Sequence, residues 1–147
     1  MAELTVTHRY GASPERVFDA WLDPKTAGRF LFATPGGEMI VCEIDARVGG
    51  GFDLTERRPE MGDVRHVGQY LEIERPRRLV FSFAVPQFDP TETTVTIDIT
   101  PDGDGCVLRL HHTGVGEDWK DGTIDGWTKI LASLEPALEG RQAAAWV

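Results

Sequence analysis

Apolar residues near the end of the chain recur at spacings of three and four. Over residues 117–138 this spacing predicts a helix with one apolar stripe, and charged residues fall on the opposite side. The stripe consists of Trp119, Thr123, Trp127, Ile130, Leu131, Leu134 and Leu138. Because two tryptophans are bulky, this helix needs a broad, concave apolar surface to pack against. Pro136 favours a kink or an early end of the helix.

A period of two runs through most of the preceding chain. Alternating apolar and polar residues predict strands at 3–9, 39–46, 52–56, 64–74, 79–85, 93–100 and 107–112. Two short helices are expected after the first strand, with Ser13 and Asp23 as N-caps and a proline at the first position of each. Consecutive strands followed by one helix indicate an α+β fold, with an antiparallel sheet of about six or seven strands gripping the last helix.

Length and charge narrow the class of protein. We expect one domain over residues 1–139 and a tail over 140–147, in which Trp146 folds back or meets a partner. The formal charge of −9 argues against a nucleic-acid partner and against an anionic membrane surface, because both need clustered Lys and Arg.

Metal, phosphate and redox sites are not expected. Cys42 and Cys106 are far apart and form no C-x-x-C motif, and the glycines at 49–51 belong to no phosphate-binding loop motif. One disulfide is conceivable from two cysteines. However, the start of the chain has no signal-peptide pattern and no long apolar run occurs, so we expect a cytoplasmic location, reduced thiols and no membrane insertion. No cofactor is predicted.

Three polar residues interrupt the apolar face that the strands are expected to turn towards the helix. If Val95, Ile97 and Ile99 point inwards, the partner strand places His112 on the same face. Glu56 and Gln69 are expected there on two other strands. A buried polar group needs a partner or a ligand, because an unpaired one costs about 1–3 kcal/mol. These residues therefore indicate a pocket with a few convergent polar groups.

Each of these assignments has an alternative. His112 is either a hydrogen-bonded strand-end histidine or a group that binds or deprotonates a ligand, and Glu56 is either a solvated strand end or a buried acid. His66 is expected at the surface. A slip of one residue in the strand 64–74 would exchange its faces, turning His66, Gly68, Tyr70 and Glu72 inwards in place of Val67, Gln69, Leu71 and Ile73.

Four stretches of the chain resemble a known family. They are residues 13–21, 45–52 and 68–81, and the pair Gly126-Trp127 with the leucines after it. On these residues the chain resembles the START-like helix-grip proteins, and within them the Aha1-type group, the Activator of Hsp90 ATPase homologue C-terminal-domain-like proteins. The resemblance covers about residues 4–138 and concerns structural positions, so it is informative about fold more than about function.

This resemblance implies a curved antiparallel sheet around the C-terminal helix, with a cavity between them. Members bind hydrophobic small molecules, act on them as cyclases or hydrolases, or serve as co-chaperones. Many members have Trp where this chain has Phe30 or Phe32, so an aromatic ring is kept and an indole N–H is lost. The eukaryotic Hsp90 activators resemble this chain only in their C-terminal half.

We therefore expect a hydrophobic or amphipathic small molecule to bind between the sheet and the last helix. The expected ligand-binding residues are Phe30, Phe32, Phe52, Glu56, Gln69, Phe83, Val85, His112, Trp119, Thr123 and Trp127. Three alternatives remain: an Hsp90 co-chaperone-like interaction module, an enzyme of the cyclase or hydrolase type in the same cavity, or a small cavity filled by Trp119 and Trp127. The chain carries no nucleophile elbow and no H-E-x-x-H motif, and no catalytic residue is assigned. Either a monomer or a homodimer is compatible with the sequence.

Overall fold

The computed structural model describes residues 2–34 and 36–139. Over these residues seven antiparallel strands form one sheet in the order β1-β7-β6-β5-β4-β3-β2. The strands are β1 Ala2–Tyr10, β2 Glu38–Ile44, β3 Gly51–Arg58, β4 Gly62–Glu74, β5 Arg78–Val85, β6 Asp89–Asp102 and β7 Gly105–Val115. This confirms the predicted α+β class and the number of strands. The tail 140–147, with Trp146, lies outside the described residues.

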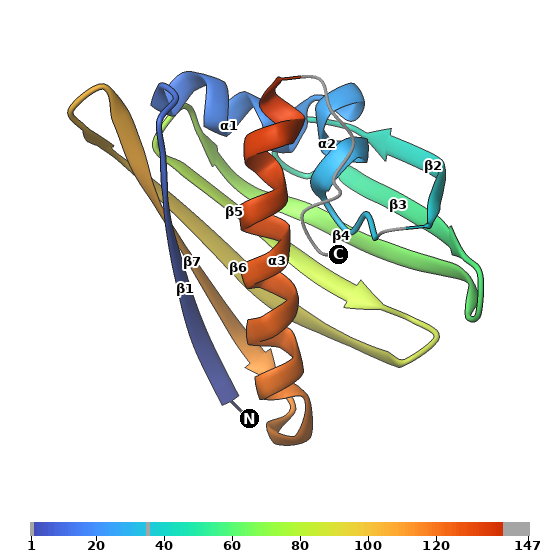
Figure 1. Cartoon of the computed structure of the whole chain (residues 1–147). Coiled ribbons are helices and arrows are strands. Elements are labelled where there is room, and N and C mark those ends of the chain that lie inside the picture. The colour runs from blue at the N-terminus through green and yellow to red at the C-terminus, as the bar shows by residue number, and fades with distance from the viewer. Residues whose placement is uncertain (1, 35, 140–147) are drawn as a thin grey trace.

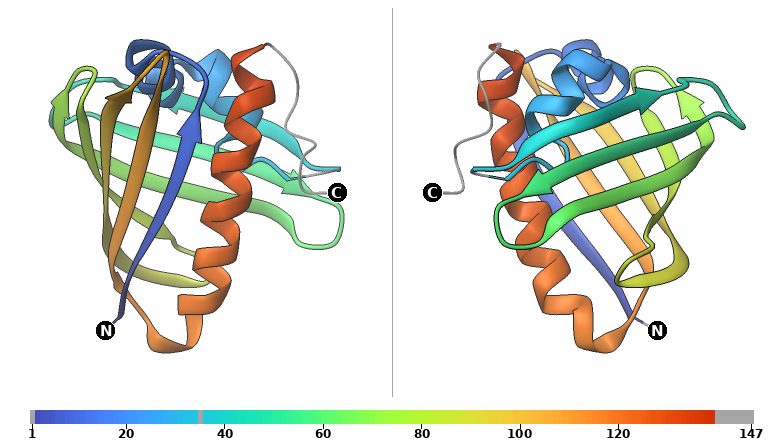
Figure 2. Two further views of the ribbon diagram at one scale, coloured as in Figure 1. Left: turned by 60° about the vertical axis from the view of Figure 1, so that its left-hand side comes forward. Right: turned by 90° about the vertical axis from the view of Figure 1, so that its right-hand side faces the viewer.

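Three α-helices accompany the sheet over the part of the chain described. Helices α1 (Pro14–Leu22) and α2 (Pro24–Phe30) connect β1 to β2, and α3 (Lys120–Leu138) follows a short 3-10 helix, η1 (Glu117–Trp119). The sheet curves around α3, which crosses its concave face, while α1 and α2 lie at one end of the sheet (Figures 1 and 2). The helix remains continuous through Pro136, so the predicted early end was wrong.

The two short helices begin as their sequences predict. Oγ of Ser13 accepts a hydrogen bond from the backbone N–H of Arg16 at 3.2 Å. The carboxylate of Asp23 accepts one from the N–H of Lys25 at 3.3 Å and one from the hydroxyl of Thr26 at 2.9 Å. These side chains satisfy backbone donors that a helix start leaves unpaired, so α1 and α2 have fixed starting points.

The core lies between the concave face of the sheet and the three helices. Val95, Ile97 and Ile99 of β6 are buried there together with Leu108 and Leu110 of β7, as the alternation predicts. On α3, Trp127, Ile130, Leu131, Leu134 and Ala137 are buried against them. The hydroxyl of Tyr10 donates to the backbone carbonyl of Leu131 at 2.7 Å and so fixes β1 against α3.

Candidate ligand-binding site

Two of the three polar residues expected on the inner face of the sheet lie on it. Glu56 is 1% exposed and His112 is 2% exposed. Gln69 is exposed, and its side-chain Nε2 donates to the backbone carbonyl of Gly49 at 3.0 Å. Gly68 pairs with Phe52, whose side chain is in the core, so the next residue, Gln69, points to the outer face. The predicted inward position of Gln69 was wrong.

Most of β4 has the alternative register, shifted by one residue, that the sequence left open. Val64, His66 and Tyr70 are buried, whereas Leu71 is exposed. The pairing of β4 with β5 then shifts between Tyr70 and Glu72, and this irregularity returns Ile73 to the core side. The predicted face was therefore wrong for the first part of the strand and right for Ile73.

His112 lies within a chain of hydrogen bonds that joins the helix to the sheet. The indole N–H of Trp127 lies 3.0 Å from Nδ1 of His112, and Nε2 of His112 lies 2.6 Å from Oγ1 of Thr93. The hydroxyl of Thr93 donates to the backbone carbonyl of Phe83 at 2.9 Å. Since the indole donates and the hydroxyl proton is engaged, Nε2 carries the imidazole proton and Nδ1 accepts.

This arrangement favours a neutral His112. The pKa of His112 is lowered to about 4, mainly by burial and to a smaller extent by the neighbouring His111. Protonation would place a hydrogen on Nδ1, directly opposite the indole N–H. With both ring nitrogens engaged, His112 offers a ligand no free lone pair and acts here as a positioned wall rather than as a base.

His66 is buried, so its predicted surface position was wrong. Its ring stacks on Phe32 at a centroid distance of 4.3 Å, and Phe32 in turn stacks on Phe83 at 4.9 Å. Nδ1 of His66 donates to the backbone carbonyl of Leu54 at 3.0 Å. Burial lowers the pKa of His66 to about 4, so this ring is neutral near pH 7.

Glu56 binds the segment that follows α2. Its carboxylate accepts from the backbone N–H of Thr34 at 2.7 Å and from the hydroxyl of Thr34 at 2.8 Å. Arg58 donates to the same carboxylate at 2.7 Å. The backbone at Phe32 has a φ of 59°, an uncommon value for a residue other than glycine, and it turns the ring towards His66 and Phe83. The carboxylate of Glu56 is thus satisfied by hydrogen bonds from the protein itself.

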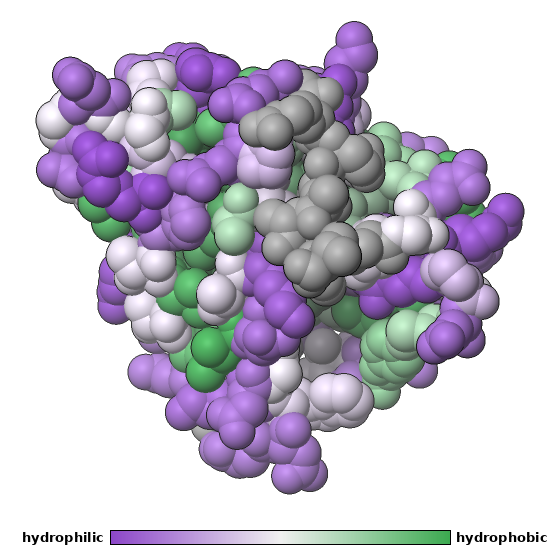
Figure 3. Space-filling view, in the orientation of Figure 1, coloured by the Kyte–Doolittle hydropathy of each residue, from purple (hydrophilic) through white to green (hydrophobic). Residues whose placement is uncertain are grey.

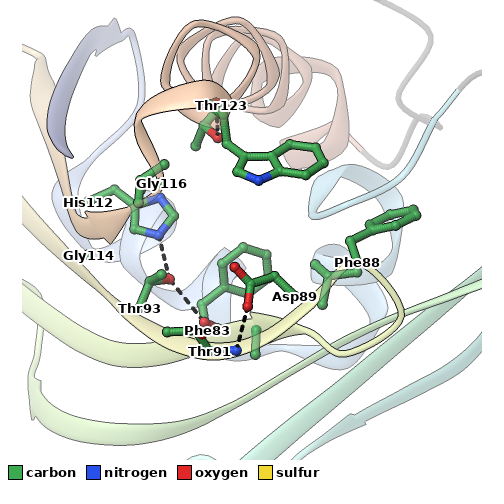
Figure 4. A pocket seen from close by; sticks show the side chains of 13 residues that line it. Phe83, Phe88, Asp89, Thr91, Thr93, His112, Gly114, Gly116 and Thr123 are labelled. Atoms are coloured by element: carbon green, nitrogen blue, oxygen red, sulfur yellow. Dashed lines mark hydrogen bonds between the residues drawn. The ribbon is translucent and has the colours of Figure 1, made fainter. Parts of the chain in front are cut away.

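A cavity opens beside His112, at the end of the sheet where α3 begins. Its volume is about 150 Å³, close to that of an apolar cavity that holds one benzene-sized molecule. The lining residues are Phe83, Ala84, Val85, Phe88, Asp89, Thr91, Thr93, His112, Gly114, Val115, Gly116, Trp119 and Thr123. Figure 4 shows His112 and Thr93 on one side of this space and Phe88 on the other, with Asp89 between them. In the space-filling view the surface is hollowed between the β5–β6 hairpin and the start of α3 (Figure 3).

The predicted ligand-binding residues separate into two groups. Phe83, Val85, His112, Trp119 and Thr123 line the cavity. The others do not line it: Phe30, Phe32, Phe52 and Trp127 pack in the core, Glu56 binds the segment after α2, and Gln69 lies on the outer face. The four core aromatics occupy much of the space between sheet and helix, which explains why the cavity lies at one end.

Trp119 takes a different position from the one its helical spacing predicts. It is 56% exposed, at the end of η1 rather than on the buried stripe of α3. A Cβ atom on Gly116 would lie 3.1 Å from Cδ1 of Trp119, so the indole rests over this glycine. Phe88, in the β5–β6 turn, is 51% exposed. Both rings therefore form the rim of the cavity, and the alternative in which Trp119 fills it is wrong.

Sequence reasoning missed the residues that the loops contribute. Phe88, Asp89 and Thr91 come from the β5–β6 turn and the first residues of β6. Thr93 could have been found, because the inward alternation of Val95 and Ile97 extends back to it. No sequence signal relates Phe88 to Trp119, since their proximity depends on how two loops meet.

The described residues contain no group of three His, Cys, Asp or Glu side chains arranged to hold a metal ion. Cys42 and Cys106 are both free thiols. Within the same part of the chain, no helix is long and apolar enough to cross a membrane.

Solved structures with the same fold are numerous. Protein CV1439 from Chromobacterium violaceum is 25% identical with a TM-score of 0.80, and the match covers 92% of this chain and 96% of that one. CalU16 from Micromonospora echinospora is 28% identical with a TM-score of 0.69, over 92% and 75% of the two chains. The AHSA1-like protein from Aeromonas hydrophila is 20% identical with a TM-score of 0.74, over 95% and 93%.

None of the curated proteins compared with the chain matches it. A family model matches residues 11–139, which span both short helices, six of the seven strands and α3. The curved sheet, the long C-terminal helix and this match agree, and the chain belongs to the family described as Activator of Hsp90 ATPase homolog 1-like protein.

Proposed function

We propose that this domain binds a small apolar or amphipathic molecule in the cavity beside His112. The observation that carries the proposal is a cavity of about 150 Å³ whose rim exposes two large aromatic side chains, Phe88 and Trp119. An exposed aromatic pair next to a cavity is a surface that a ligand can cover.

The size of the cavity limits the ligand. Typical sites for drug-sized molecules measure about 300–1,000 Å³. A cavity of about 150 Å³ suits one ring or a short chain, with the remainder of a longer molecule passing out over the rim. Since His112 and Thr93 already bind each other, the wall they form fixes the shape of the site more than it binds polar groups.

The test is a calorimetric titration of the protein with single-ring compounds such as phenol and indole, together with native mass spectrometry of the purified protein. We expect one saturable site. Thr123→Phe should block it, because Thr123 lines the cavity. Thr128→Phe is the matched control, since both residues are threonines of α3 whose hydroxyls donate to the carbonyl four residues earlier in the chain, but Thr128 is exposed. Equal binding by both variants, or no binding by the wild type, would reject the proposal.

A second candidate function is interaction with an Hsp90-type chaperone. The family description names an Hsp90 activator, and the same exposed rim supplies apolar residues for a protein contact. This candidate predicts that the domain binds the organism's Hsp90 homologue and changes the ATPase rate of that chaperone. The double substitution Phe88→Ser with Trp119→Ser should abolish both effects. Capture without dependence on these two residues would place the contact elsewhere.

A further inference from the structure

Among the described residues, one charged side chain lines the cavity, and that side chain is acidic. Asp89 lines the space together with Phe88 and Trp119, and no Lys or Arg of residues 2–34 and 36–139 belongs to the lining. The Asp89 carboxylate accepts a hydrogen bond from the backbone N–H of Thr91 at 2.9 Å (Figure 4). The pKa of Asp89 is lowered mainly by the hydrogen bond from the Thr91 backbone N–H, and also by one from the Thr91 side chain. The carboxylate is therefore ionised near pH 7.

The segments around the mouth are acidic as well. Residues 86–93 and 116–121 bring one lysine, Lys120, and five carboxylates. The carboxylates are Asp89, Glu92, Glu117, Asp118 and Asp121. The surface over η1 and the start of α3 is hydrophilic (Figure 3). With a formal charge of −9 on the whole chain, the potential at this opening favours cations and repels anions.

Aromatic faces beside a carboxylate suit a particular ligand chemistry. An ammonium group is attracted to the face of an indole or phenyl ring within about 6 Å, and tryptophan is the best such partner. Trp119 and Phe88 present exposed rings at the rim, and Asp89 supplies the counter-charge between them and the inner wall. The inner wall itself, with Phe83 and Val85, is apolar and suits a ring or alkyl group.

From this arrangement we propose that the cavity selects a small organic cation: an amine whose apolar part enters beside Phe83 and whose ammonium group stays at the rim, between Asp89 and the ring of Trp119. This inference rests on the proposed function and names the ligand class for the same cavity. A neutral molecule of the same shape would use only the inner wall, and a carboxylate would be repelled by Asp89.

Three probes of nearly equal size separate these possibilities: 2-phenylethylamine, 2-phenylethanol and 3-phenylpropanoate, titrated calorimetrically at pH 7. We expect the amine to bind about tenfold more tightly than the alcohol, as one ion pair and one cation–π contact at a partly exposed site allow. The carboxylate should bind least. Added salt should weaken binding of the amine and leave binding of the alcohol unchanged.

Asp89→Asn tests the carboxylate directly. Asparagine retains an oxygen that accepts from the Thr91 N–H, so the turn remains supported while the charge is lost. The tenfold preference for the amine should disappear. Asp104→Asn is the matched control, because it removes the same charge beyond the opposite end of β6, whose strand rises about 3.3 Å per residue. Trp119→Leu should lower amine affinity and leave alcohol affinity nearly unchanged.

The outcomes distinguish the two proposals. Equal affinity for amine and alcohol, or a preference that persists in Asp89→Asn, would overturn the cation selectivity and leave the proposed cavity function intact. If none of the three probes binds, and phenol and indole also fail, the cavity function itself is rejected together with this inference.

Discussion

Two buried polar residues on the same face of the sheet differ in what surrounds them. Glu56 on β3 is paired with Thr34 and Arg58, and the segment after α2 closes over it. His112 on β7 is paired with Trp127 and Thr93, and a cavity opens beside it. Both residues are fully buried, and both have their hydrogen-bonding atoms engaged by the protein.

A polar residue on an apolar strand face therefore does not by itself indicate a ligand contact. At Glu56 a loop from elsewhere in the chain satisfies the polar group and seals the space. At His112 the satisfying partners come from α3 and β6, and the two loops that meet there leave a gap lined by Phe88 and Trp119. The loops therefore decide whether such a position becomes a structural clamp or the wall of a site.

Acid should affect both regions, because each contains one buried histidine with a lowered pKa: His66 beside Phe32 and His112 beside the cavity. Each folded pKa of about 4 lies below the ordinary value of 6.5, so the unfolded chain binds more protons between these limits. Stability should fall as the pH drops from 6.5 to 4, by roughly 3 kcal/mol for each histidine, and this contribution should not change further below pH 4.

Urea unfolding of His66→Phe at several pH values measures how much of the pH-dependent loss of unfolding free energy comes from the region of His66 and Phe32. The variant keeps a ring against Phe32 but removes the imidazole that titrates, so roughly 3 kcal/mol of the loss of stability in acid should vanish. Val64→Ala, a core change on the same face of β4, should lower stability at all pH values without changing the slope. An unchanged slope in His66→Phe would show that its burial does not influence its titration.

Glu56→Ala should give the largest loss among the single substitutions at pH 7. Removing the carboxylate leaves the Thr34 N–H and the partly buried Arg58 guanidinium without their partner, and breaking a buried pair costs about 3–5 kcal/mol. Chemical denaturation measures this loss. Glu43→Ala on the neighbouring strand β2 is the control, since Glu43 is exposed and should change stability by less than about 0.5 kcal/mol. Similar values for the two variants would mean that Glu56 does not clamp the segment after α2.

Two buried tryptophans allow the His112 hydrogen bond to be isolated. Trp127 donates to His112, whereas the indole N–H of Trp21 has no hydrogen-bond partner among the described residues. Trp127→Phe and Trp21→Phe remove the same atoms, but only Trp127→Phe leaves a buried acceptor unpaired. We expect the loss of unfolding free energy to be greater for Trp127→Phe by about 1–2 kcal/mol. A double-mutant cycle with His112→Leu should show coupling of similar size, and additive effects would argue against the bond.

The architecture could be predicted from the sequence because helix caps and strand alternation are local patterns. Ser13 and Asp23 cap the helices where expected, and the alternation over residues 93–100 gave the correct inner face. Which face of β4 points inwards could not be predicted from the sequence. Val67 and Leu71 are apolar although they point outwards, and the shift after Tyr70 reverses the alternation without any local pattern that reports it. Gly68 is explained only by the fold, since a Cβ there would lie 2.5 Å from the ring of Phe52.

The site was only partly accessible, for a related reason. His112 and Phe83 were assigned to the inner face correctly, since strand alternation decides this. Spacing alone puts Trp119 on the helical stripe, because it does not separate the start of α3 at Lys120 from the preceding 3-10 helix. Phe88 and Asp89 depend on the meeting of two loops that are distant in sequence, and periodicity contains no information about such contacts.

The smallest expected effect concerns the rim. Because Phe88 and Trp119 are about half exposed, Phe88→Ser and Trp119→Ser should each change the free energy of unfolding by no more than about 0.5 kcal/mol, measured by urea denaturation. Phe83→Ala, from the stacked rings of the inner wall, should be destabilising by about 3 kcal/mol in the same assay. If the rim variants instead lose more than about 1 kcal/mol, the two rings belong to the core and the cavity is a packing defect. If rim substitutions leave the free energy of unfolding unchanged and the inner-wall substitution lowers it, the residues available to a ligand are distinct from those required for folding.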